Sequence, residues 1–245
     1  QLLSEAQRPL NLDPENNMQK SGIILIFCMQ ALLSACAIKT PVQHHYKLNA
    51  HSCKKISEKP TSTSILVTHP TAVSGYQTEK MRYIIKPFEL SAYANNAWVG
   101  TPAALIFPLI TQSLQYSGYF SAVSASPYAD QTNYRLDTQL IELHQNFLTQ
   151  PSIIELAIKA VLSNNDKNRV VASRLFTLKI PCPQETFYGG VLAANRAANL
   201  FILQLTDFVI KQIKQDRTLS ETIAKNPKKP YNTMPLKTAG LARKK

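Results

Sequence analysis

The residues best placed for covalent chemistry stand near the beginning of the chain, where an apolar run ends in Leu33, Ser34, Ala35 and Cys36. The run follows Lys20, so the segment has the charged start, apolar stretch and small-residue site of a secretory signal. Cleavage between Ala35 and Cys36 would free the amine of Cys36, and its thiol would carry diacylglycerol. Several acyl chains anchor a protein stably in a bilayer, where a single chain does not. The sequence therefore predicts a lipoprotein that is acylated at Cys36 and held to a membrane by it.

The apolar segment is too short to be a membrane span. A spanning helix needs ~20 apolar residues, whereas this stretch is shorter and is interrupted by Gln30. The alternative, a buried helix of a cytosolic protein, fits its flanking residues less well. We therefore assign 18–35 to a lipoprotein signal peptide and 1–17 to an upstream extension outside the native protein. Ala37, where inner-membrane lipoproteins usually carry Asp, favours the outer membrane, with the domain facing the periplasm.

Positive charge is concentrated at the end of the chain. The sequence holds 27 Lys and Arg against 15 Asp and Glu, a formal net charge of +12. From Lys211 onward, ten Lys or Arg are opposed only by Asp216 and Glu221. Export argues against a nucleic-acid partner, and the chain has no nucleic-acid-binding motif. We predict a disordered basic tail at 214–245; anionic lipid head groups or the acidic face of a partner are the alternatives for its contacts.

Outside Cys36, the chain shows no constellation typical of a catalytic or metal site. His44, His45, His51 and Cys53 lie close together, but their spacing matches no standard metal site. The sequence also has no nucleophile elbow, no zinc-protease motif and no glycine loop for phosphate. We therefore expect a protein that is not an enzyme and that has no catalytic residues, metal or cofactor.

Two cysteines remain after cleavage of the signal and acylation of Cys36, namely Cys53 and Cys182. Disulfides persist in an oxidising compartment such as the periplasm. A bridge between these two residues would close a long loop, which is worth ~4–5 kcal/mol in the chain-entropy model. The alternative is two unrelated thiols.

Apolar spacing predicts two helices and several strands in the remaining sequence. The stretch 101–118 begins with a capping Thr and a Pro at the first helical position and ends with Gly, although Pro108 interrupts it. A second helix is expected at 188–214, with an alanine-rich first half that allows close packing. Strands are predicted at 46–48, 64–68, 81–85, 90–93, 134–143, 153–162 and 169–178.

The order of these elements predicts an α+β fold, with a mostly antiparallel sheet and two helices packed on one face. The domain would occupy 46–213, joined to the acylated cysteine by a tether at 36–45. Three motifs stand in order within it. They are Gly75-Tyr76 with Met81 and Tyr83; Leu90-x-x-Tyr93-Ala94-x-Asn96-x-Trp98-Val99 before Pro102; and Arg174-x-Phe176 with Gly190-Val191-x-Ala193-Ala194-Asn195-x-Ala197.

With the preceding lipoprotein signal, this combination resembles the ABC-type transport auxiliary lipoprotein component family, which includes the paraquat-inducible protein C-like lipoproteins. Members of that family accompany ABC systems that carry an MCE-domain (mammalian cell entry) substrate-binding protein and move phospholipids between membranes. The resemblance implies a non-catalytic outer-membrane accessory component that docks the periplasmic MCE-domain protein. Pro108 and the basic tail depart from the family pattern but lie outside the three motifs.

The resemblance also directs attention to three aromatic residues. Trp98, Tyr76 and Tyr93 are candidates for contact with the MCE-domain partner, and the alternative for each is a place in the core. Two other functions stay open at this point. One is a periplasmic lipid-binding carrier, which needs a sizeable apolar cavity; the other is a structural envelope lipoprotein without a transport role.

Overall fold

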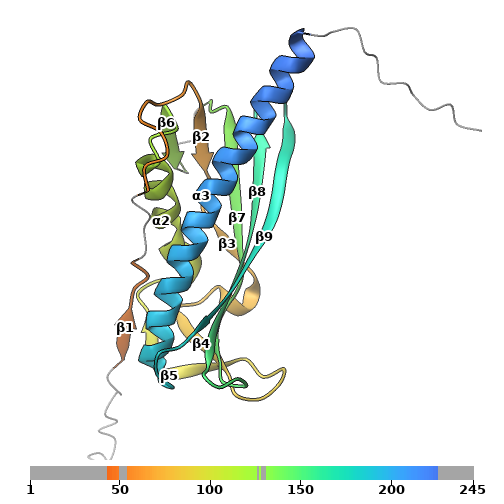
Figure 1. Ribbon diagram of the computed structural model, residues 1–245. Helices are drawn as coiled ribbons and strands as arrows, with labels where there is room; N and C mark the ends of the chain where they lie inside the picture. The colour runs from red at the N-terminus through yellow and green to blue at the C-terminus, as the bar shows by residue number, and fades with distance from the viewer. Residues whose placement is uncertain (1–42, 50–53, 126, 128–130, 226–245) are drawn as a thin grey trace, which may run out of the picture. The chain divides into compact units, whose positions relative to one another are not determined.

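The computed structural model describes residues 43–49, 54–125, 127 and 131–225, which form one curled sheet with two helices packed against it (Figure 1). The α+β class is therefore confirmed for these residues. In chain order the elements are β1 (His44–Tyr46), β2 (Ser64–Val67), β3 (Thr71–Ala72), the 3-10 turn η2 (Ser74–Tyr76), β4 (Lys80–Ile84), β5 (Ser91–Trp98), α2 (Pro102–Tyr116), β6 (Ala122–Ala125), β7 (Tyr134–Asn146), β8 (Ile153–Asn164), β9 (Arg169–Pro181) and α3 (Phe187–Lys225).

The sheet is organised around β7, which has partners along both edges. On one edge, β8 runs antiparallel to β7, and β9 runs antiparallel to β8. On the other edge, the short strands β2, β3 and β4 follow one another along β7, all parallel to it. Beyond them, β6 pairs with β2, β5 pairs with β4, and β1 pairs with β5. The long strand β7 therefore serves as the template for most of the sheet.

The sheet is mixed, so the predicted mostly antiparallel sheet is wrong. Strands β1, β2, β3, β4 and β6 each have a parallel partner. Antiparallel pairing among the described strands is confined to β4–β5, β7–β8 and β8–β9. Parallel neighbours require a long connection that returns the chain to its starting end. Here the passage through β4, β5 and α2 returns the chain so that β6 runs beside β2 in the same direction.

Most predicted strands are confirmed, with shifted ends. The first strand lies at 44–46 rather than 46–48, and β5 extends the predicted 90–93 as far as Trp98. The short strands β3 and β6 were not predicted, because two to four residues carry too little alternation to be recognised.

Helix α2 follows its local signals. The hydroxyl oxygen of Thr101 accepts a hydrogen bond from the N–H of Ala104 at 3.4 Å, and the helix continues through Pro108. The chain reverses at Gly118, which has a φ of +68°. A Cβ at that glycine would lie 2.4 Å from the carbonyl oxygen of Ser57, so a side chain there is excluded by both the backbone and the space. The predicted helix and its glycine stop are confirmed.

Helix α3 is longer than predicted. Residues 214–225, expected to begin the tail, continue the helix instead. The physical reason is Asp216, whose carboxylate is buried and accepts hydrogen bonds from the Tyr134 hydroxyl at 2.8 Å and the Asn164 amide at 2.7 Å. These contacts attach the last turns of the helix to the sheet. The rest of the predicted tail, 226–245, lies outside the described residues.

The core lies between the two helices and the sheet. The alanines of the first half of α3 are almost fully buried, which lets the helix backbone approach the sheet closely. No helix in the part of the chain that the structure describes is both long and apolar enough to cross a membrane. The largest fully buried side chains are Phe201, Ile65, Ile106, Ile110, Leu114, Leu136, Leu140, Leu156, Ile158, Leu162, Ile202 and Leu205.

Candidate functional site

The predicted acylation and cleavage site, Ala35 and Cys36, lies outside the described residues, as does Cys53. Cys182 is described and buried directly after β9, where its backbone N–H donates to the carbonyl oxygen of Ser152 at 2.8 Å. Burial raises the pKa of the Cys182 thiol, which keeps it protonated and unreactive near neutral pH. The bridge between Cys53 and Cys182 stays a prediction.

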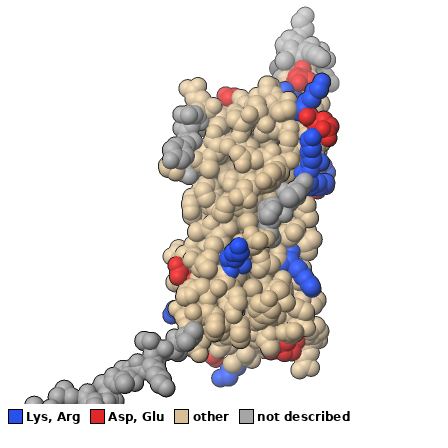
Figure 2. Space-filling model, turned by 90° about the vertical axis from the view of Figure 1, so that its left-hand side faces the viewer, with Lys and Arg blue, Asp and Glu red and all other residues tan. Residues whose placement is uncertain are grey.

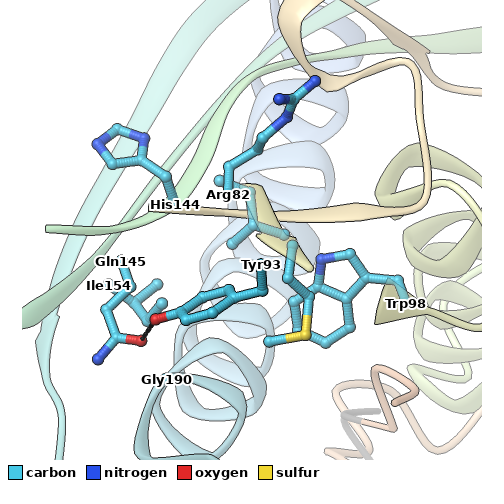
Figure 3. A pocket seen from close by; sticks show the side chains of 9 residues that line it. Arg82, Tyr93, Trp98, His144, Gln145, Ile154 and Gly190 are labelled. Carbon is cyan, nitrogen blue, oxygen red and sulfur yellow. Dashed lines mark hydrogen bonds between the residues drawn. The ribbon is translucent and has the colours of Figure 1, made fainter. Parts of the chain in front are cut away.

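Two of the predicted aromatic residues line one small cavity under the beginning of α3 (Figure 3). The cavity measures about 10 Å³, close to the space that a single water needs. Sites for small molecules usually measure ~300–1,000 Å³, so this cavity holds no lipid chain or substrate. The cavity is lined by the side chains of Arg82, Tyr93, Trp98, His144 and Gln145 and by the backbone of Gly190, among others.

Gln145 connects the elements around this cavity. Its Oε1 accepts a hydrogen bond from the Tyr93 hydroxyl at 2.9 Å, and Figure 3 shows that hydroxyl pointing at the carboxamide. Its Nε2 donates to Ser152 Oγ at 3.0 Å and to the carbonyl oxygen of Thr186 at 3.3 Å. One carboxamide on β7 therefore holds β5, the corner before β8 and the entry to α3.

Gly190 allows α3 to approach that carboxamide. A Cβ at this position would lie 2.3 Å from Gln145 Oε1, well inside any real contact. At the preceding Gly189, a Cβ would lie 2.1 Å from the carbonyl oxygen of Gln184. The contact between Tyr93, Gln145 and Gly190 therefore joins the second and third motifs, which are far apart in the sequence.

A second polar chain lies beside the cavity. The Tyr76 hydroxyl is 2.9 Å from His144 Nδ1, and His144 Nε2 is 3.0 Å from Glu155 Oε2. Phenol, imidazole and carboxylate in this order are the parts of an oriented general base. Burial, together with the negative charge of Glu142, raises the pKa of Tyr76 to about 12, so its oxygen stays protonated near neutral pH. Glu155 also forms an ion pair with Lys179, whose Nζ lies 2.7 Å from the carboxylate. The polar atoms of Tyr76, His144 and Glu155 are therefore all paired with other residues of the domain.

The described histidines form no metal site. His44 and His45 lie on β1 with exposed side chains, while His51 and Cys53 lie outside the described residues. Nowhere in 43–49, 54–125, 127 or 131–225 do three His, Cys, Asp or Glu side chains gather as metal ligands.

The aromatic residues predicted for partner contact lie mainly in the core. Trp98 exposes 3% of its surface and Tyr76 8%, and the Tyr93 hydroxyl is occupied by Gln145. Tyr93 itself is half-buried. Two large apolar side chains in the loop between β4 and β5, Ile85 and Phe88, are exposed. Ile85 is the last residue of the strand predicted at 81–85, so its exposure was not expected. Phe88 was not singled out because an isolated apolar residue in a turn has no periodicity; its signal is its place directly after Pro87, where turns are usually polar.

Two larger hollows open on the surface beside α3. One, of about 500 Å³, is lined by Ile180 and Leu200 together with Asn49, Asn195, Arg196 and Asn199. The other, of about 340 Å³, is lined in part by Lys211 and Lys214. Figure 2 shows Lys and Arg gathered along one side of the drawn face, whereas most of the remaining surface is uncharged. Neither hollow encloses an apolar ligand.

Comparison with known proteins identifies the fold. No protein-family model and no curated protein sequence matches the chain. A crystal structure of a Xanthomonas campestris protein of the DUF330 family is 20% identical, covers 71% of this chain and 98% of its own, and superposes with a TM-score of 0.64. A second crystal structure, of an uncharacterized protein, is 11% identical, covers 69% of this chain and 99% of its own, and has a TM-score of 0.56. At these identities the likeness concerns the fold alone, so this chain has the fold of the DUF330-family protein.

Proposed function

We propose that this chain is an outer-membrane lipoprotein, anchored through Cys36, that serves as a non-catalytic accessory component of an MCE-type ABC system for phospholipid transport. It would dock the periplasmic MCE-domain protein at the membrane. The observation that carries the proposal is a lipoprotein signal ending at Cys36 ahead of a compactly filled domain that bears the three motifs in order. The meeting of two of these motifs at Tyr93, Gln145 and Gly190 supports their common role in building the domain.

The size of the internal cavity supports an accessory role over a lipid carrier. A carrier must enclose acyl chains in an apolar space, typically of ~300 Å³ or more. The cavity under α3 measures about 10 Å³, and the hollows beside that helix are open to solvent, so they do not enclose an acyl chain. On this argument the protein acts through its surface, by binding another protein.

The saturated polar groups support a function without catalysis. The Tyr76 phenol has a pKa raised to about 12, and the His144 ring is enclosed between Tyr76 and Glu155. The cavity that His144 lines measures about 10 Å³, far below the ~300 Å³ of a usual small-molecule site. Their contacts join η2, β7 and β8, so their contribution is to the stability of the sheet.

Acylation is tested by membrane fractionation of Cys36→Ser. We expect this variant to accumulate as unprocessed precursor in the inner membrane. Cys28→Ser is the matched control, because it changes a cysteine of the same signal without touching the cleavage site, and it should fractionate as the unchanged protein does. Normal processing of Cys36→Ser would refute the lipoprotein proposal. An inner-membrane shift of Ala37→Asp would support outer-membrane sorting.

The partner is tested by purifying the acylated protein in mild detergent and identifying the proteins and lipids that accompany it. An MCE-domain protein with little bound phospholipid is the expected result. Stoichiometric phospholipid without that protein would favour the carrier instead. Recovery of neither, in both detergent and native membrane extracts, would favour a structural lipoprotein.

A further inference from the structure

Two loops that are far apart in the chain lie side by side at one end of the sheet. Strands β4 and β7 are parallel, with Ile84 opposite Asn146, so the loops that follow them emerge at the same end of the sheet. The N–H of Phe147 donates to the carbonyl oxygen of Ile84 at 2.9 Å. The rings of Tyr83 and Phe147 also meet edge to face, with centroids 6.3 Å apart. Backbone and aromatic contacts therefore hold the two loops together.

Both loops present apolar side chains to solvent. Phe88 is fully exposed, and Ile85 and Leu148 expose 51% and 49% of their surfaces. We name these three residues the apolar tip. Phe88 also has a φ of +67°, in the left-handed region that disfavours residues with a Cβ. A large apolar side chain held outward on strained backbone is not explained by packing within the domain, and such outliers often mark functional positions.

The apolar tip lies at the end of the domain to which the predicted anchor is connected. Strand β1 is parallel to β5, and β5 begins shortly after Phe88, so the beginning of β1 faces the same end (Figure 1). His44 follows Cys36 by eight residues, and eight residues span at most about 28 Å. An acylated Cys36 would therefore keep His44 within that distance of the bilayer.

The charges near the tip suit insertion rather than attraction to an oppositely charged partner. Lys86 Nζ and Glu89 Oε2 lie 3.8 Å apart in the same loop, so their charges offset each other. The cationic side chains Lys211 and Lys214 lie far along α3. That helix has 39 residues, a length of about 58 Å at 1.5 Å per residue. The tip would therefore bind through its apolar area, with little dependence on salt.

From these observations we propose that the apolar tip, Ile85, Phe88 and Leu148, inserts into the phospholipid surface of the membrane to which Cys36 is anchored. The proposal rests on the proposed acylation of Cys36 and adds an orientation to it. The domain would stand with the β4–β5 loop and the corner after β7 against the bilayer. Helix α3 would then lead away from the membrane and carry its cationic end toward the periplasmic side.

Quenching by brominated lipid tests the insertion. The full-length acylated protein is reconstituted into vesicles of phosphatidylethanolamine and phosphatidylglycerol, with and without brominated phosphatidylcholine. In Phe88→Trp, we expect a blue-shifted emission that loses intensity as brominated lipid is added. The native Trp98 contributes a constant background because it is 3% exposed. Leu219→Trp is the matched control, since Leu219 is 61% exposed near the far end of α3, and its emission should stay unquenched.

The possible failures are distinguishable. If the protein remains on vesicles and mass spectrometry finds acyl chains on Cys36, but Phe88→Trp is not quenched, the insertion proposal is wrong and the anchor stands. A blue shift without quenching would indicate that protein covers the tip, and it would also overturn insertion. Equal quenching of Phe88→Trp and Leu219→Trp would refute the proposed orientation. Absence of acyl chains on Cys36 would refute the anchor and, with it, this inference.

Discussion

Two of the contacts that attach helix α3 to the sheet differ in kind. Near its beginning, Gly190 lies against the neutral carboxamide of Gln145, with no space even for a methyl group. Near its far end, the side chain of Asp216 is 1% exposed and forms an ion pair with Arg169, while it accepts hydrogen bonds from the sheet. The first attachment depends on shape and the second on ionisation. The two should therefore respond to different perturbations.

The difference also explains why one attachment could be anticipated from the sequence and the other could not. Glycines and alanines at helical spacing indicate close packing wherever they occur. An acidic residue in a basic, polar stretch usually indicates solvent instead, as in our assignment of 214–245 to a tail. Burial of Asp216 is tolerated because Tyr134, Asn164 and Arg169 meet it there.

Removing the charged attachment should have the largest effect. Asp216→Ala leaves the buried Tyr134 hydroxyl and Asn164 amide without their acceptor, at a cost of about 3 kcal/mol in the free energy of unfolding. Urea denaturation of the purified domain measures it. Asp207→Ala is the control on the same helix, because its ion pair with Lys54 is half exposed on both sides and should matter by less than ~1 kcal/mol. Equal losses in the two variants would contradict the distinction.

Crowding the neutral attachment should have the next largest effect. Gly190→Ala forces a methyl group to 2.3 Å from Gln145 Oε1, and overpacking of this kind costs about 2 kcal/mol. Gly100→Ala is the matched control, because a Cβ there would meet Leu105 at an ordinary 3.7 Å. In a double-mutant cycle, Gln145→Ala should relieve part of the Gly190→Ala cost. Purely additive effects would show that the two residues do not meet in solution.

Acid should weaken the charged attachment and leave the neutral one unchanged. Burial alone would raise the pKa of Asp216, but hydrogen bonds from Asn164 and Tyr134 and the charge of Arg169 outweigh it, so this pKa lies below the usual Asp range. The charged attachment therefore stabilises the fold above the unfolded pKa, and that contribution is lost as pH falls through the lower, folded pKa.

Unfolding of three proteins across the acidic range measures this. The stability advantage of the unchanged protein over Asp216→Asn should shrink as pH falls, whereas the deficit of Gly190→Ala should stay constant. Glu155, whose pKa is also lowered, affects all three proteins alike and drops out of the comparison. A constant advantage over Asp216→Asn would show that Asp216 is not ionised in the folded protein.

The smallest effect is expected at the apolar tip, where Phe88 is fully exposed. Phe88→Gly relieves the left-handed backbone, worth ~1–2 kcal/mol, but gains freedom in the unfolded chain, worth ~0.5–1 kcal/mol. We expect a net stabilisation of about 0.5 kcal/mol, seen as a slightly higher Tm. Phe88→Ala, which keeps the strained φ, should show no gain. A clear loss in Phe88→Gly would mean that the ring packs within the domain.

Much of the fold was accessible from local patterns. Three local signals were recognised in short stretches of sequence because each acts on neighbouring residues: the cap at Thr101, the stop at Gly118 and the alanine-rich start of α3. The long strands β7, β8 and β9 alternate enough to be found, with errors only at their ends. The candidate site was only half accessible, because the sequence offered both partner contact and a core position for Tyr93 and Trp98, whereas their meeting with Gln145 and Gly190 was not anticipated.

Local patterns in the chain specify the two helices and the long strands, because capping, helical spacing and alternation act between near neighbours. It also supplied the basis for the prediction that Cys36 is acylated, since that prediction depends on a contiguous signal. Three features became visible in the folded chain alone: β2, β3 and β4 run parallel to β7, Asp216 is buried, and Ile85, Phe88 and Leu148 lie at one end of the sheet. These features depend on contacts between segments far apart in the chain. Such contacts form only when the loops between the segments close, so no short stretch of sequence reveals them.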